Sequence, residues 1–157
     1  EVVAGAELWT VEGERRRVSP EYFEFGYDDS ILHHRADIVL SADFALTPTP
    51  IDELRRIIRE NLAWRDERHP DLWLYPCAGS IFKKIEGIGA GRLIDQCGLK
   101  GRTCGGAQIF HRHANIIVNV GGANARDVLT LMQLARDTVL RETGHELEPE
   151  IDLVGEF

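Results

Sequence analysis

The apolar residues in the first part of the chain form short alternating runs, which are typical of strands. Residues 1–18 predict two strands joined by a turn at Glu12-Gly13, and residues 36–46 (ADIVLSADFAL) predict a third, strongly apolar strand. Between them, Ser19 and Pro20 open the sequence SPEYF, which fits the cap and first position of a helical turn. We therefore expect a small sheet in this part of the protein.

A proline-rich break follows, with the sequence TPTP at 47–50. We place a domain boundary there, between residues 1–48 and 49–157. Thr49 and Pro50 fit the cap and first position of a helix. Apolar residues then recur every three or four positions, and we expect them to pack on a sheet: Ile51, Leu54, Ile57, Ile58 and Leu62.

The remaining sequence alternates short apolar runs with helical patterns. The best helix starts after Asn124 and ends before Gly144, and GAGRLIDQC predicts a shorter one. Predicted strands are LWLY (72–75), SIFK (80–83), GAQIF (106–110), ANIIVNV (114–120) and ELEPEIDLVGE (146–156). This alternation predicts an α+β domain with a mixed sheet that the helices cover.

Composition excludes several classes of function. The 157 residues are 43% hydrophobic, and the net charge of −8 is spread without a basic cluster, which argues against nucleic acid as a partner. No apolar run approaches membrane-spanning length, and no signal-peptide pattern is present. The three cysteines lack CxxC spacing, which indicates reduced thiols in a cytosolic protein. The chain starts at Glu1 within a predicted strand, so we expect it to be part of a longer protein.

Few residues suggest chemistry on their own. Ser80 follows a tight Ala78-Gly79 turn, where a serine either hydrogen-bonds its own turn or transfers a proton. His111 and His113 could share a strand face, but no further ligands converge on them, so we expect no metal site. Glu148 and Glu150 flank a proline and fit a charged edge strand. These alternatives stay open at the level of the residues.

Five segments in order resemble the UDP-N-acetylenolpyruvoylglucosamine reductases, flavoenzymes that complete UDP-N-acetylmuramate for peptidoglycan. The segments are FGYDDS (25–30), PCAGSIFKK (76–84), AGRLIDQCGLKG (90–101), GGAQIFHRHANIIVN (105–119) and LEPEIDLVGE (147–156). The resemblance implies that residues 1–48 are the end of an FAD-binding domain and that residues 49–157 form a substrate-binding domain. The part of the family that carries most of the FAD site has no counterpart in this chain.

The resemblance also implies a reaction and a set of residues. NADPH reduces FAD, the flavin gives a hydride to the enolpyruvyl double bond, and a serine, here Ser80, supplies the proton. Glu150 is the family's glutamate that helps to stabilise the developing enolate. Tyr27, Arg68 and Lys84 are implied to contact the UDP-sugar, with Arg68 near its diphosphate. The implied partners are this substrate and the absent FAD-binding portion, in the cytoplasm.

The chain departs from the family where charge matters most. The family's catalytic arginine, in FGYRDS, is replaced by Asp28. A like charge added ~4 Å from the enolate would cost about 4 kcal/mol at an effective dielectric near 20. Lys84 stands where the family commonly has asparagine, and Phe110 where it often has serine.

Three interpretations therefore remain. The protein could be a reductase in which Lys84 supplies the missing positive charge, beside Asp28. It could instead be a diverged homologue that binds a UDP-sugar and lacks, or has altered, the reductase activity. A third possibility is an interaction domain without a ligand.

Overall fold

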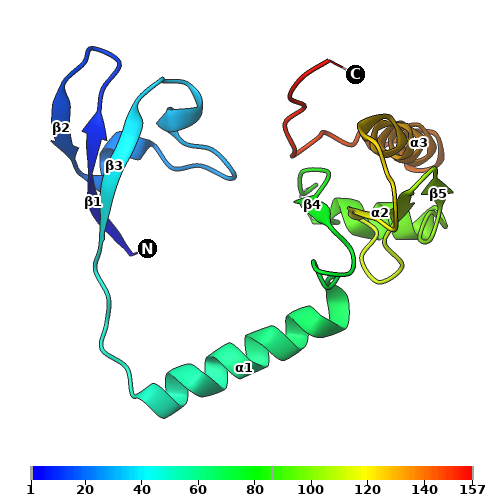
Figure 1. Ribbon diagram of the computed structural model, residues 1–157, viewed down its shortest axis with the longest axis horizontal. Helices are drawn as coiled ribbons and strands as arrows, with labels where there is room; N and C mark the ends of the chain where they lie inside the picture. Colours follow the sequence, from blue (N-terminus) through cyan, green and yellow to red (C-terminus); the bar gives the residue numbers. More distant parts are fainter. Residues whose placement is uncertain (1, 86, 157) are drawn as a thin grey trace. The chain divides into compact units, whose positions relative to one another are not determined.

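The computed structural model describes residues 2–85 and 87–156 and separates them into two compact units (Figure 1). The first unit ends at Leu54 and the second begins at Arg55, inside a helix. This division lies a few residues after the boundary predicted between residues 48 and 49. The assignment of the two parts to FAD-binding and substrate-binding domains stays a prediction.

The first unit is built on a three-stranded antiparallel sheet, as the alternating pattern predicts. Its strands are β1 (Val3–Trp9), β2 (Arg15–Val18) and β3 (Ile38–Phe44), in the order β2-β1-β3. The 3-10 turns η1 (Pro20–Phe23) and η2 (Ile31–His33) lie between β2 and β3 in the chain. Ser19 and Pro20 occupy the cap and first positions of η1, as predicted, but the Ser19 side chain makes no capping hydrogen bond. A small core joins the sheet to η1: Ala6, Leu8, Val18 and Phe23.

The second unit contains a four-stranded antiparallel sheet with helices packed on it. Its strands are β4 (Cys77–Ser80), β5 (Thr103–Cys104), β6 (Ala107–Ile109) and β7 (Ile116–Asn119), in the order β4-β7-β6-β5. The helices are α2 (Ala90–Gln96) and α3 (Ala125–Thr143). The α+β class is confirmed, but every described pairing is antiparallel, rather than the mixture of directions that the sequence suggested.

The helix α3 matches its sequence signals closely. Asn124 and Asp127 form a reciprocal capping box, and Gly144 ends the helix in the left-handed conformation that glycine adopts readily. Its buried face lies against β5, β6 and α2, and completes the main core. The buried residues are Leu131, Met132, Ala135, Thr138 and Val139.

The helix α1 (Ile51–Arg68) forms where predicted, but none of its residues is buried. Its apolar stripe stays between 38% and 61% exposed, from Ile57 to Ile51. The prediction that this helix packs on a sheet is therefore wrong for the chain by itself. A helical period identifies an apolar face, but it does not say which segment covers that face.

Three predicted strands are also wrong. SIFK (80–83) contributes only Ser80 to a strand, because β4 (Cys77–Ser80) ends there. LWLY forms a hydrogen-bonded turn in which Asp71 O accepts bonds from Leu74 N and Tyr75 N. Within the described residues, the closing segment makes only an isolated bridge, between Phe82 and Pro149. Most apolar side chains of LWLY and of the closing segment are exposed. An apolar run alone therefore did not indicate a buried strand here.

Candidate functional site

Ser80 lies at the last position of β4, where the chain leaves the sheet. It is paired with Ile116 of β7. Gly79 before it has a φ of 84°, a backbone conformation that would be strained for a residue with a side chain. The next residue, Ile81, donates its N–H to the carbonyl of Asn115 over 2.9 Å. The sheet therefore fixes the backbone on both sides of the Ser80 hydroxyl group.

Asn115 is a positioning residue that the sequence analysis missed. Its side chain accepts a hydrogen bond from Phe82 N over 3.0 Å and donates one to Phe82 O over 2.8 Å. Asn115 is only 7% exposed. Its side-chain amide pairs with the Phe82 backbone as a neighbouring strand would, and so it satisfies the buried N–H and C=O of Phe82. The pairing spans 33 residues of sequence, and no local motif announces it.

Glu150 lies directly beside the Ser80 segment. Glu150 N donates to Ile81 O over 2.8 Å, and Lys83 N donates to Glu148 O over the same distance. The Lys83 ammonium also contacts the Glu148 carboxylate at 2.5 Å. The LEPE segment thus follows the chain just after Ser80, and two residues that the resemblance links to catalysis come from neighbouring backbones.

Arg68 and Lys84, which the resemblance links to the substrate, also belong to this unit. Arg68 is the last residue of α1, and its guanidinium lies over the Trp64 ring at 4.8 Å and donates to the Glu67 carboxylate at 2.8 Å. Lys84 is exposed. Both side chains are accessible to an anionic ligand.

Tyr27 and Asp28 belong to the first unit, on a turn closed by a 2.9 Å hydrogen bond from Gly26 N to Asp29 O. Tyr27 is 66% exposed. Asp28 has a φ of 51°, a conformation that aspartate tolerates better than most residues. The proposed pairing of Asp28 with Lys84 joins the two units and stays a prediction.

Asp29 ties this turn to η2. Its carboxylate accepts a bond from Ser30 N, and it contacts the imidazoles of His33 and His34 at 3.0 and 3.2 Å. These bonds, that of His34 foremost, hold the pKa of Asp29 below its ordinary value. The turn that presents Tyr27 and Asp28 is therefore fixed by side chains as well as by backbone.

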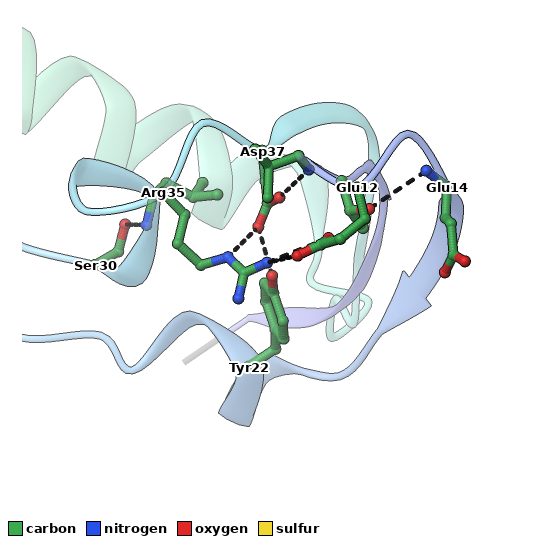
Figure 2. A network of polar contacts seen from close by, with 9 residues as sticks. Glu12, Glu14, Tyr22, Ser30, Arg35 and Asp37 are labelled. Atoms are coloured by element: carbon green, nitrogen blue, oxygen red, sulfur yellow. Dashed lines mark hydrogen bonds and ion pairs between the residues drawn. The ribbon is translucent and has the colours of Figure 1, made fainter.

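A second polar network stabilises the same unit (Figure 2). Asp37, whose side chain is fully enclosed, accepts bonds from Tyr22 Oη at 2.5 Å, Arg35 Nε at 2.9 Å and Val11 N at 2.8 Å. Arg35 also contacts Glu12. The Tyr22 hydrogen bond is the main reason that the pKa of Asp37 is lowered.

Two histidines meet in the second unit, beside the end of α1. The rings of His69 and His113 are 5.2 Å apart, and His113 Nδ1 is buried without a hydrogen-bond partner among the described residues. Burial, and then the neighbouring His69, lowers the pKa of His113. His111 is exposed and packs on Phe110 instead. Among residues 2–85 and 87–156, no three His, Cys, Asp or Glu side chains are arranged to hold a metal ion.

A hollow of about 680 Å³ opens beside this histidine pair, a size typical of small-molecule sites. Leu62, Pro70, Leu72 and Trp73 form its apolar wall. Arg112 lies at its edge and donates to the carbonyls of Asp66 and His69, at 2.7 and 3.1 Å. This arginine satisfies carbonyl groups that the end of α1 leaves unpaired.

Comparison with known proteins places these features in one family. The model of the UDP-N-acetylenolpyruvoylglucosamine reductase C-terminal domain matches residues 70–154. The reductase of Agathobacter rectalis is 43% identical over 157 residues, which is 100% of this chain and 49% of that protein. The reductase of Alkaliphilus oremlandii is 43% identical over 156 residues, covering 99% of this chain and 51% of its own length.

A solved structure agrees with the sequence comparisons. The crystal structure of UDP-N-acetylenolpyruvylglucosamine reductase from Thermus caldophilus matches with a TM-score of 0.80 and 34% identity, over 96% of this chain and 52% of that chain. The chain thus spans about half the length of the relatives it matches. On this evidence, the chain belongs to the UDP-N-acetylenolpyruvoylglucosamine reductase family of oxidoreductases.

Proposed function

We propose that this chain is the substrate-binding portion of a reductase that converts UDP-N-acetylglucosamine enolpyruvate to UDP-N-acetylmuramate with FAD and NADPH. The observation that carries the proposal is the hydrogen bond from Glu150 N to Ile81 O, which brings the LEPE and AGS segments together in a member of this family. Nothing in the composition requires these two segments to meet. Their contact supports the family's pairing of Ser80 with Glu150.

In this proposal the chain's own residues donate the proton and contact the charged substrate. Ser80 Oγ gives a proton to the enolpyruvyl carbon that does not take the hydride, and Glu150 assists that transfer. Arg68 and Lys84 contact the UDP-sugar, and Tyr27 does so from the first unit. A serine is a weak acid, so positive groups around the developing enolate have to lower the barrier.

When bound, the flavin would supply the hydride. The 680 Å³ hollow does not suit it, because the wall of this hollow offers no glycine-rich phosphate loop and mixes acidic with basic groups. We therefore expect most of the FAD site to lie outside this chain, and we derive no step through the cofactor from these residues.

The partner that fits this proposal is an amino-terminal portion like the other half of the longer relatives. All seven residues of β3 are exposed, among them Ile38, Val39, Leu40 and Phe44, although this strand is strongly apolar. β3 is also the last strand of its sheet in the described part of the chain. We propose that the absent portion covers this strand. None of the helices in the described residues could cross a membrane. The cytoplasmic location stays a proposal that rests on the resemblance to the family.

The test is turnover of the enolpyruvyl substrate by the longer protein that we infer, with NADPH oxidation followed by absorbance. The proposal expects flavin reduction and substrate reduction together. If NADPH reduces the flavin and UDP-sugars bind, but no substrate is reduced, the diverged-homologue alternative is correct. Asp28 has a left-handed backbone, which suits aspartate better than arginine. This observation supports the diverged-homologue alternative.

A further inference from the structure

Trp73 is the most exposed large apolar residue described in the chain, with 96% of its surface accessible. Its neighbours Leu72 and Leu74 are 57% and 68% exposed. An indole carries a large apolar area that folding normally buries. An exposed indole on the wall of a ligand-sized hollow therefore indicates a binding surface.

The turn that carries Trp73 is held firmly. Asp71 Oδ1 accepts a bond from Trp73 N over 2.9 Å, and Asp71 O accepts bonds from Leu74 N and Tyr75 N over 3.1 and 2.7 Å. The Tyr75 ring then packs against Phe110, which is completely buried, with 5.8 Å between ring centres. The exposure of Trp73 thus belongs to an anchored turn, which presents the indole at low entropic cost.

The charges around the hollow indicate what could bind against this indole. Arg65 and Arg112 bring positive charge to the lining, and Asp66 and Asp71 bring negative charge. Arg112 already donates to backbone carbonyls, so its remaining capacity for a phosphate is reduced. A bare phosphate would meet both signs of charge, whereas a planar ring with N–H and C=O groups could use donors and acceptors alike.

We propose that this hollow takes the uracil ring of the UDP-sugar and that Trp73 is the residue on which the ring stacks. The inference rests on the proposed function for the identity of the base. Stacking on an aromatic side chain contributes substantially to the binding of a nucleobase. Trp73 would then determine affinity for the nucleotide, while Ser80 and Glu150 act on the enolpyruvyl group.

The experiment titrates UDP and inorganic pyrophosphate separately into the chain by calorimetry. The variants are Trp73→Leu, which removes the ring, and Trp73→Phe, which keeps one. Trp9→Leu, on β1 of the first unit, is the matched control because Trp9 is a partly exposed tryptophan outside the hollow. We expect Trp73→Leu to weaken UDP binding about tenfold or more, with Trp73→Phe and Trp9→Leu within about threefold of the unaltered chain.

A second readout distinguishes stacking from a structural effect. The uracil H5 and H6 resonances of bound UDP should shift upfield with the unaltered chain, and this shift should disappear with Trp73→Leu. The proposal is overturned if the unaltered chain does not bind UDP, if Trp73→Leu binds UDP unchanged, or if it loses pyrophosphate and UDP affinity equally. Substrate turnover by the longer protein with unchanged UDP affinity in Trp73→Leu would leave the proposed function standing and remove only the role of Trp73.

Discussion

Ser80, Glu150 and Asp28 differ in how far the sequence alone could identify them. The resemblance singles out all three, and the structure brings the first two onto neighbouring backbones. Asn115 was not identified, and His113 was considered only as a metal ligand, because a buried amide that pairs with Phe82 and an unpartnered ring nitrogen become visible only once distant segments meet. Residues that act through long-range contacts leave no local sequence signal.

The proton-donor role of Ser80 predicts a specific kinetic defect. In the longer protein, Ser80→Ala should lower substrate reduction by about 10²–10⁴-fold, since a positioned proton donor contributes that much. Reduction of the flavin by NADPH should keep its rate, because Ser80 does not take part in it. Stopped-flow absorbance separates the two half-reactions, and equal loss in both would contradict the assignment.

The charge at Asp28 predicts a gain of function. Asp28→Arg should raise the rate of enolpyruvyl reduction in the longer protein, because it replaces a like charge near the developing enolate by an opposite one. The left-handed backbone at this position opposes the change and should cost some stability. Asp28→Asn serves as the control, since it removes the charge and suits the backbone. A rate for Asp28→Arg at or below that of the unaltered protein counts against this electrostatic explanation.

Among the elements, those with complete local signals formed as predicted. The helix α3 has a capping box, a glycine stop and a regular apolar face, and all three operate in the structure. The predicted closing strand and the LWLY strand had only an apolar run, and neither forms. The sequence predicted an element correctly where its capping, periodicity and termination signals agreed. It did not do so where an apolar run was the only signal.

The connection after β4 depends on Asn115, and its loss should be costly. Asn115→Ala removes two hydrogen bonds and leaves the N–H and C=O of the buried Phe82 unpaired, so we expect a loss of about 2–4 kcal/mol in the free energy of unfolding. Urea denaturation measures this. Gln133→Ala, which removes an exposed contact with Asp137 on α3, should change stability by less than about 0.5 kcal/mol. Similar losses in both variants would contradict the role of Asn115.

The contact between His69 and His113 predicts a pH dependence of the second unit. Both pKa values are lowered, chiefly by burial, so the unfolded chain binds more protons once the pH falls below about 6.5. Stability should therefore be fully present above that pH and decrease below it. Thermal unfolding between pH 7.5 and 5.5 should show this decrease, and His113→Gln should reduce it. His111→Gln is the control at an exposed site, and an unchanged pH dependence in His113→Gln would refute the prediction.

At the scale of the whole molecule, two apolar surfaces besides the turn of Trp73 are uncovered in the described residues. One is β3, and the other is the stripe of α1. The sequence predicted both elements, but it could not show that they would remain exposed, since an apolar pattern carries no record of which segment covers it. The relatives are about twice as long as this chain, so the part that they have in addition could supply the segments that cover these two surfaces.

Cofactor binding tests whether that cover is required. We expect the chain alone to bind FAD weakly or not at all, because its hollow lacks a phosphate loop. Addition of an amino-terminal half from a relative such as the Agathobacter rectalis reductase should restore stoichiometric flavin and reduce the accessibility of β3 to hydrogen exchange. A yellow, flavin-saturated preparation of the chain alone would contradict this.

The open edge of β3 also bears on how the chain behaves in concentrated solution. Its sequence, IVLSADF, is rich in strand-forming residues, and β1 is the only described strand that pairs with it. Such an edge can pair with the same edge of another copy and extend into aggregates. Asp43 is the one charged residue that interrupts the run, and its carboxylate forms an ion pair with Arg17 of β2, so this pair is the charged feature that opposes self-assembly. Loss of this ion pair should therefore favour association of the isolated chain through β3.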